Sequence, residues 1–433
     1  MDQLHLGVAR EIITPEIGGQ LYGYRPNIFS ERVADDLTAT AFYFKQGNKE
    51  CILISVTVCS VKTELSDSIL QQIQEQTGVF KENCILCAIH THSGPNLTGD
   101  VGWGDVDAAY RDNIFVPRVL SAAKKATQTA VPVTMGVASG NSYVGVNRRE
   151  LTLDNKITFG QSPWSCFNPK MTVISFRDAA DKPVANLIHY GAHCTGAGHN
   201  HEVTRDWAGV MIDGLEKESG AITAFINGPE GDVGPRLSNG RTIGDLNLAY
   251  ELGTIGAEDA KGIYRQIADY TVPRLQVCTK VCEVPYKPRM TKEEAQAMYE
   301  QFKDKTVNIS GMRRATALQV LESYEKGMEE QKSDDFLQTM IAFDNTVLVS
   351  FPYEPFSEIG LRIDKAFPNA QILSVALANG TKGYFITEDA ICRGGYEVNC
   401  FLYWGVQSYV ENADWYLVQN TVENIKNVIT EEE

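Results

Sequence analysis

The chain has 433 residues, of which 43% are hydrophobic and 22% are charged, which is typical of a soluble globular protein with a large core. It carries 39 Lys and Arg against 55 Asp and Glu, so its formal net charge is −16. Such a chain is a poor electrostatic match for nucleic-acid phosphates or anionic lipid, and we expect no nucleic-acid partner. No stretch approaches the ~20 apolar residues of a membrane span, so we expect no transmembrane segment. No pattern indicates the oligomeric state.

The N-terminus and the cysteines bear on the cellular compartment. Residues 1–5 lack the basic and apolar regions of a signal peptide. Ten cysteines are spread along the chain, mostly in apolar runs such as 83–87, which favours reduced core thiols. Cys84 and Cys87 make a poor metal or redox pair, because an odd offset in a strand turns their side chains to opposite faces. We therefore expect a cytoplasmic protein, or an exported one if a leader was removed before residue 1.

A pattern of hairpin, loop, helix and strand recurs three times along the chain. The first copy comprises 40–44, 51–56, an apolar helix face at Leu65, Ile69 and Ile73, and 84–89. The second comprises 171–176, 184–188, a helix beginning near Asp206, and 222–226. The third comprises 337–343, 346–351, a helix over 359–367, and 372–377. A crossover helix makes its flanking strands parallel. The sequence thus predicts an α/β fold of mixed sheets built from repeated hairpin-helix-strand units and flanked by helices.

One segment departs from this repeated order of hairpin, helix and strand. After a strand at 277–284, two charged helical stretches follow near 291–302 and 312–332. We interpret them as a helical insertion, about 285–333, on the outside of a single domain spanning 1–433. An amphipathic helix is expected at 414–430.

The histidines cluster in a way that indicates a site. Only seven are present; two are His90 and His92 and four lie between 189 and 201. A pair two apart at a strand end directs both imidazoles from one face, where they can ligate zinc, set one ligand beside a proton-transfer or substrate-binding group, or simply be satisfied by hydrogen bonds. His193 and Glu354 follow equivalent strands of the second and third copies. Because α/β sheets build sites at the carboxyl ends of their strands, these residues together form the ligand set of a catalytic zinc with an open position.

Polar residues follow other strand ends. Asp232 lies in the glycine-rich turn 228–236, where it caps the turn, supports the site or contacts an anion. Arg148 lies in the polar segment 147–150, from which its guanidinium can reach a carboxylate or an oxyanion. The run 383–397 is rich in polar aromatic residues near glycines, which usually pack with a tethered hydroxyl.

Taken in order, these motifs match a known family. The sequence resembles the catalytic N-terminal domain of the neutral/alkaline ceramidase family over roughly residues 5 to 425. The matching motifs are 7–15 with Gly23-Tyr24, His90-Thr91-His92-Ser93-Gly94-Pro95, 147–149, 228–235, 351–355 and 383–396. Of these, the motif that begins at His90 is the most specific.

The resemblance implies a zinc amidohydrolase that cleaves an N-acyl, ceramide-like amide with metal-activated water. The implied zinc ligands are His90, His193, Glu354 and Tyr384. The implied residues that line or support the site and orient water or the substrate carbonyl are His92, Arg148, Tyr396 and Asp232. A small-molecule or lipid N-acyl substrate would need an apolar groove, for which the candidate side chains are Trp103, Trp164, Phe167, Tyr403 and Trp404.

Two departures from the family weaken ceramide as the substrate while leaving the metal site intact. Gly234 stands where the family has a serine whose hydroxyl is proposed for catalysis. We also expect no C-terminal immunoglobulin-like domain.

Two other interpretations stay open from the residues. One is a metal hydrolase with a His-x-His pair on a (β/α)₈ barrel, which would require eight strand-helix units. The other is a non-catalytic carbohydrate- or lipid-binding protein that keeps the scaffold.

Overall fold

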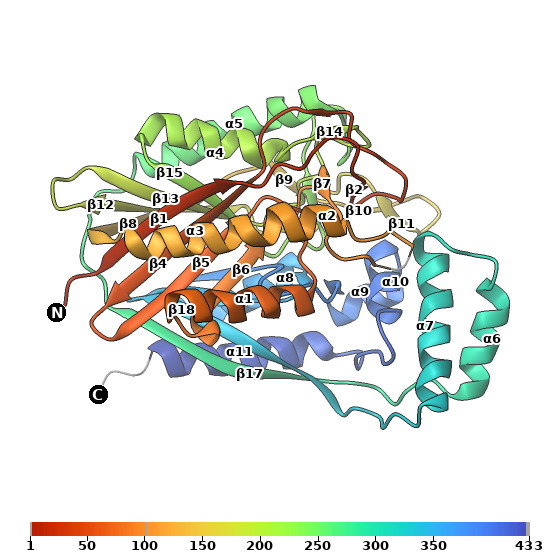
Figure 1. Ribbon diagram of the computed structural model, residues 1–433. Helices are drawn as coiled ribbons and strands as arrows, with labels where there is room; N and C mark the ends of the chain where they lie inside the picture. The colour runs from red at the N-terminus through yellow and green to blue at the C-terminus, as the bar shows by residue number, and fades with distance from the viewer. Residues whose placement is uncertain (1, 101, 430–433) are drawn as a thin grey trace.

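Two stacked β-sheets form the centre of the molecule and helices cover their outer faces (Figure 1). The computed structural model describes residues 2–100 and 102–429. The large sheet has the strand order β15-β13-β12-β8-β1-β4-β5-β6 and the small sheet the order β17-β18-β19-β21. The strands of the large sheet are β1 (His5–Ile12), β4 (Thr38–Gln46), β5 (Lys49–Val56), β6 (Cys84–Ala88), β8 (Val131–Asn141), β12 (Lys170–Asp178), β13 (Pro183–Tyr190) and β15 (Ile222–Asn227). Those of the small sheet are β17 (Leu275–Pro285), β18 (Ser333–Phe343), β19 (Thr346–Ser350) and β21 (Gln371–Val375).

The three repeats predicted from the sequence are present. The hairpins β4-β5, β12-β13 and β18-β19 are antiparallel. Each hairpin leads through a helix to a strand parallel to its second strand, namely β6, β15 and β21. The crossover helices are α1 (Thr63–Thr77), α4 (Asp206–Ser219) and α8 (Ser357–Ala366). The mixed α/β prediction is confirmed, and the (β/α)₈ barrel is wrong because the strands form two open, stacked sheets.

Strand β5 contributes alternate side chains to two separate hydrophobic cores. Ile52, Ile54 and Val56 face the helices α1 and α3 (Val116–Gln128). Cys51 and Leu53 face the opposite way, into the space between the two sheets. Successive strand side chains point to opposite faces, so a strand covered on both sides is apolar at every position. At about 1.5–3 kcal/mol for each fully buried large side chain, this central layer holds the sheets together.

Helices complete the outer layers. Helices α4 and α5 (Leu246–Tyr264) pack against each other over one end of the large sheet (Figure 1). Helix α3 packs over β1 and β4, and α1 lies beside α3 toward the β6 edge (Figure 1). Helix α11 (Ala413–Ile429), expected at 414–430, packs beside α8 against the small sheet. Across residues 2–100 and 102–429, we find no helix whose length and hydropathy would let it cross a bilayer.

The expected insertion forms a two-helix arm that projects beyond the sheets (Figure 1). Helix α6 (Lys292–Phe302) begins with a capping box, in which Thr291 and Glu294 each accept a hydrogen bond from the other's backbone N–H. Helix α7 (Asn308–Glu325) ends earlier than predicted, because Gly327 adopts a left-handed φ of 61° that terminates helices. That residues 1–433 form a single domain stays a prediction.

The last strands of the three repeats meet at their carboxyl ends. Asn227, at the end of β15, accepts a backbone hydrogen bond from Ala376 at 2.9 Å, and its amide donates to the Ile89 carbonyl at 3.2 Å. A bridge between Cys87 and Ala378 joins the ends of β6 and β21. The loops that follow all three repeats are thereby brought to one place, although β6 and β15 are opposite edges of the large sheet.

Candidate metal centre

Three side chains, one from each repeat, meet at this junction. His90 follows β6, His193 follows β13, and Glu354 lies in β20 (Glu354–Pro355) after β19. The Oε2 atom of Glu354 lies 3.1 Å from Nε2 of His193 and 3.4 Å from Nε2 of His90. All three side chains are buried, and one donor atom of each lies within 4.8 Å of the other two. The structure therefore brings together three of the four predicted zinc ligands.

Hydrogen bonds behind the two imidazoles fix their orientation. His90 Nδ1 lies 2.9 Å from the carbonyl of Cys59, and His193 Nδ1 lies 2.9 Å from that of Glu230. A carbonyl only accepts, so each Nδ1 carries a proton and each Nε2 is directed toward Glu354. Although burial opposes protonation, Cys59 and Glu354 raise the pKa of His90 well above its usual range, so without a metal its Nε2 faces the carboxylate with a proton. Burial, together with the charge of Arg148 and the neighbouring His90, lowers the pKa of His193 to about 3, which keeps this imidazole neutral.

The carboxylate lacks the donor that such burial requires. Glu354 Oε2 accepts no hydrogen bond from the part of the chain that the structure describes. Although burial opposes ionisation, His90 and His193 hold the pKa of Glu354 well below its usual range. A buried anionic oxygen needs positive charge beside it, which either a proton on His90 Nε2 or a cation between the three donor atoms supplies. Two imidazoles and one carboxylate, each oriented from behind, fit a zinc ion.

Tyr384, the fourth predicted ligand, lies beside this cluster. It begins β22 (Tyr384–Phe385), which pairs in parallel with β20 so that Tyr384 is opposite Glu354. Its hydroxyl oxygen is 3.4 Å from His193 Nε2 and accepts a hydrogen bond from Arg148 Nη2 at 3.0 Å. The hydroxyl is thus close enough to complete the donor set, and ligation by Tyr384 stays a prediction.

His92 reaches the cluster by a different route from the one expected. Strand β6 ends at Ala88, and His90 has a left-handed φ of 70°, so the two imidazoles do not converge by strand alternation. His92 Nε2 nevertheless lies 3.2 Å from His90 Nε2. Burial, His90 and His193 lower the pKa of His92 well below its usual range, so its ring is neutral. A second donor set, Cys59 with His90 and His92, shares His90 but contains no carboxylate.

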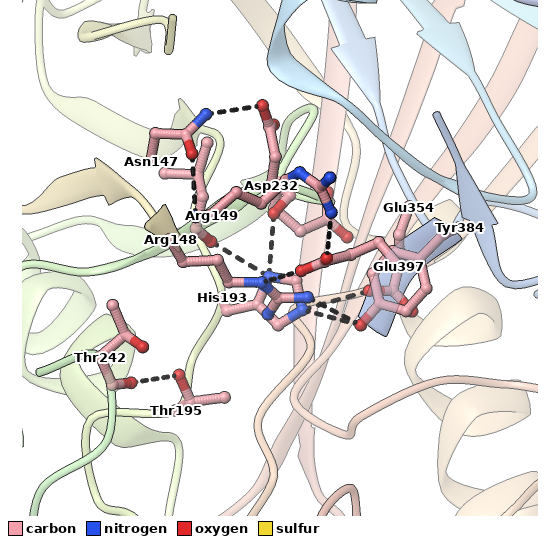
Figure 2. Close-up of polar contacts among 12 residues, drawn as sticks. Asn147, Arg148, Arg149, His193, Thr195, Asp232, Thr242, Glu354, Tyr384 and Glu397 are labelled. Carbon is pink, nitrogen blue, oxygen red and sulfur yellow. Dashed lines mark hydrogen bonds and ion pairs between the residues drawn. The ribbon is translucent and has the colours of Figure 1, made fainter. Parts of the chain in front are cut away.

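Arg148 is held by a buried ion-pair network (Figure 2). Its Nε lies 2.9 Å from Glu397 Oε1, and the other oxygen of Glu397 lies 2.6 Å from Arg149 Nη1. The guanidinium also packs over the ring of Tyr384. Sequence reasoning expected Arg148 to reach a carboxylate but did not identify Glu397, although two adjacent buried arginines require such a partner.

Asp232 lies behind Arg148 and does not line the small cavity above the three clustered side chains. Its carboxylate accepts a hydrogen bond from Asn147 Nδ2 at 2.9 Å (Figure 2). It also accepts one from the backbone N–H of Ser357 at 2.7 Å. Its backbone carbonyl accepts from the N–H of Arg148 at 2.8 Å. This placement agrees with the supporting role considered from the sequence, and Asp232 is a positioning residue in this geometry.

Glu230 is a further buried carboxyl that the sequence did not point to. Neither of its oxygens has a hydrogen-bond partner among the described residues. Burial raises its pKa well above the usual range, so the group is neutral. Its backbone carbonyl is the acceptor that orients His193.

A cavity of about 60 Å³ opens above the cluster. It is lined by five of the predicted residues, His90, His92, Glu354, Tyr384 and Tyr396. It adjoins an outer cavity of about 360 Å³. Among the aromatic candidates, Trp103 and Trp404 line both cavities and Tyr403 lines the outer one, whereas Trp164 is 95% exposed on the surface and Phe167 packs against the core of α4 and α5.

The space beside Gly234 is already filled. A Cβ atom at this position would lie 2.7 Å from Cβ of Thr242 and 3.4 Å from Cβ of Arg148. A serine side chain therefore has no room here in the observed packing. Where the family has a serine, this chain has Gly234, and the Thr242 side chain occupies the space next to it.

Comparisons with known proteins agree with this architecture. The family model "Neutral/alkaline non-lysosomal ceramidase, N-terminal" matches residues 5–247. Neutral ceramidase A of Dictyostelium discoideum is 27% identical over 219 residues, a match covering 46% of this chain and 30% of that protein. The crystal structure of neutral ceramidase from Pseudomonas aeruginosa superposes with a TM-score of 0.74 at 16% identity, covering 99% of this chain and 74% of that one. A ceramidase complexed with C2 gives a TM-score of 0.73 at 15% identity, covering 99% of this chain and 75% of that one. The chain spans about a third of the curated relative, and the solved structures share its fold. The chain belongs to the neutral/alkaline non-lysosomal ceramidase family.

Proposed function

We propose that this chain is a zinc-dependent amidohydrolase that cleaves an N-acyl amide, with ceramide-like sphingolipids as the leading substrate class. The observation that carries the proposal is the convergence of Glu354 Oε2 on the Nε2 atoms of His90 and His193, beside a cavity that His90 and Glu354 line. Together with Tyr384 these residues would hold the ion. Family membership supports the amide chemistry, since the matched relatives are named ceramidases.

Zinc, when bound there, supplies Lewis acidity that polarises a carbonyl and lowers the pKa of water. The residues of the chain supply orientation and charge. Arg148 is fixed by Glu397 and donates to the hydroxyl of Tyr384, so its positive charge lies directly behind this cavity-lining tyrosine. Developing negative charge on the amide oxygen would be stabilised by this guanidinium and by the Tyr396 hydroxyl.

His92 is the group best suited to move a proton. Its ring is neutral, and Nδ1 is a buried atom without a hydrogen-bond partner in the described residues. In the proposed reaction the oxygen of water bonds to the acyl carbon, the C–N bond breaks, and His92 passes the proton of that water to the leaving amine. The products are a carboxylic acid and a free amine. No hydroxyl at position 234 is needed for these steps.

A turnover assay tests the proposal. The metal-loaded chain is incubated with an N-acyl sphingoid base, an N-acyl amino acid and an aryl amide, and the released amine and acid are quantified. We expect equimolar release from at least one substrate, with loss of activity in His193→Ala. Tight binding of the N-acyl sphingoid base without turnover of any amide would contradict the proposal and favour the non-catalytic binding protein.

A further inference from the structure

A hydrogen-bonded tyrosine and aspartate, Tyr22 and Asp100, line the same inner cavity as Tyr384 and Tyr396. Tyr22 belongs to β2 (Leu21–Tyr22), which pairs with β7 (Gly94–Pro95), the last two residues of the motif that begins at His90. The Tyr22 hydroxyl donates to Oδ2 of Asp100 at 2.5 Å. Burial and the Asp100 carboxylate raise the pKa of Tyr22 well above its usual range, so this hydroxyl stays protonated.

The second oxygen of Asp100 is available to a ligand. Among residues 2–100 and 102–429, Tyr22 is the side chain that hydrogen-bonds Asp100, and it uses Oδ2 alone. Asp100 is half-buried and lines both the inner and the outer cavity. It therefore lies at the passage between the metal centre and the protein surface. A substrate arm that leaves the inner cavity through the outer one must pass this carboxylate.

The chemistry of the passage favours a polar group close to the amide. The inner cavity, about 60 Å³, is far below the roughly 300–1,000 Å³ of pockets that enclose drug-sized ligands, so only the reacting amide and its nearest atoms fit inside it. The outer cavity mixes Trp103 and Met312 with the charged side chains Lys62, Glu64 and Lys382. A bare alkyl chain at the boundary would strip water from Asp100 without replacing its hydrogen bonds.

We propose that Asp100 is a specificity-determining residue, which accepts a hydrogen bond from a hydroxyl or ammonium group on one arm of the amide substrate, a few bonds from the scissile C–N bond. This inference rests on the proposed amidohydrolase function and narrows its substrate class to N-acyl compounds with such a donor. A site built to pair a donor rejects the analogue that lacks it, because its own acceptor is then left unpaired.

Three isosteric amides provide the test: an acyl group on 2-aminoethanol, on ethylenediamine and on propylamine, which differ in a terminal hydroxyl, ammonium or methyl group. A second series carries the same three groups at the end of the acyl arm. In one of the series we expect kcat/KM of the zinc-loaded chain to be about 10- to 100-fold higher for a donor-bearing amide than for its methyl analogue.

Variants assign the preference to Asp100. In Asp100→Ala the ratio of kcat/KM between the donor-bearing and methyl amides should fall toward unity. Asp100→Asn keeps an acceptor oxygen but loses the charge, so a hydroxyl preference should survive and an ammonium preference should be lost. Asp100→Asn also tests the role of Asp100 if Asp100→Ala fails to fold. Asp105→Asn, an exposed position on the same loop, should leave the ratio unchanged.

The outcomes separate the two proposals. Turnover with no preference for a donor in either series, or a preference that survives Asp100→Ala, overturns the role of Asp100 and leaves the amidohydrolase function standing. Failure of the zinc-loaded chain to turn over any of the six amides, the N-acyl sphingoid base, the N-acyl amino acid or the aryl amide overturns the function, and the inference falls with it.

Discussion

Arg148 and Glu397 form a buried ion pair, with Nε 2.9 Å from Oε1, although 249 positions separate them in the chain. The carboxylate also binds Arg149, so one negative charge compensates two buried cations. This arrangement fixes the guanidinium that faces Tyr384 and, through it, the wall of the cavity. The stability of the fold and the geometry of the site therefore depend on the same contact.

Removal of the shared carboxylate should destabilise the protein strongly. In Glu397→Gln both arginines stay buried without a compensating charge, and we expect the free energy of unfolding to fall by about 3–5 kcal/mol. Urea denaturation measures the change. The control is Glu388→Gln, an exposed position at the start of α9 (Glu388–Arg393), for which we expect a change within about 0.5 kcal/mol. Equal stability of the two variants would contradict a structural role for the ion pair.

A methyl group at Gly23 should impair catalysis without loss of metal. Gly23 has a φ of +123°, and a Cβ atom there would lie 2.4 Å from Cγ of His92. Gly23→Ala must displace this ring, so we expect kcat to fall about 10- to 100-fold, as for the loss of a proton-transfer group. Zinc content should stay unchanged, because His90, His193 and Glu354 do not contact this position. Gly18→Ala separates backbone strain from the collision, since Gly18 has a φ of +95° and a Cβ atom there would meet nothing within 4 Å. If both variants lose activity equally, the contact with His92 is not the cause.

Restoring the family serine should cost stability instead of improving the site. In Gly234→Ser the new Cβ overlaps Thr242, and we expect the free energy of unfolding to drop by about 1–3 kcal/mol. Adding Thr242→Gly removes the overlapping atoms, so the loss in the double variant should be smaller than the sum of the two single losses. A double-mutant cycle by chemical denaturation measures this coupling. Strict additivity would show that the two positions do not compete for space.

The stability of the fold should depend on pH through Asp364. Burial raises the pKa of this carboxyl in α8 to about 6 from a reference of 3.8, although Lys170 opposes the shift. The protonated form therefore stabilises the folded state below pH 3.8, and this contribution is lost as the pH rises through 6. Asp364→Asn is neutral throughout, so at about pH 8 it should be about 1–2 kcal/mol more stable than the natural chain, and this advantage should shrink at about pH 4.5. Asp335→Asn, at an exposed position, should show no such pH dependence. An advantage of Asp364→Asn that is equal at both pH values would contradict the raised pKa.

Local patterns in the sequence predicted the repeats and the region of the site. Period-two and period-3.6 apolar patterns mark the strands and helices, and the right-handed crossover makes β5-β6, β13-β15 and β19-β21 parallel. It follows that the polar residues after these strands lie at carboxyl ends. For this reason His90, His193 and Glu354 could be grouped before their distances were known.

Long-range packing accounts for what the sequence left out. Glu397 is one of many carboxylates until Arg148 and Arg149 are placed against it. The left-handed φ of His90 could not be predicted from the residue type, because only a few per cent of non-glycine residues adopt a positive φ, even though histidine is among the enriched types. The pairing of Tyr22 with Asp100 depends on how two loops pack, and loops carry no periodic signal.

The metal content of the purified chain tests the central claim most directly. We predict one zinc per chain by elemental analysis of protein prepared without chelator, and loss of that zinc in Glu354→Gln. Glu358→Gln, on α8 and paired with Arg362, should retain it. A natural chain that binds no zinc even after incubation with the ion, or a Glu354→Gln variant that binds it as tightly as the natural chain, would contradict the account.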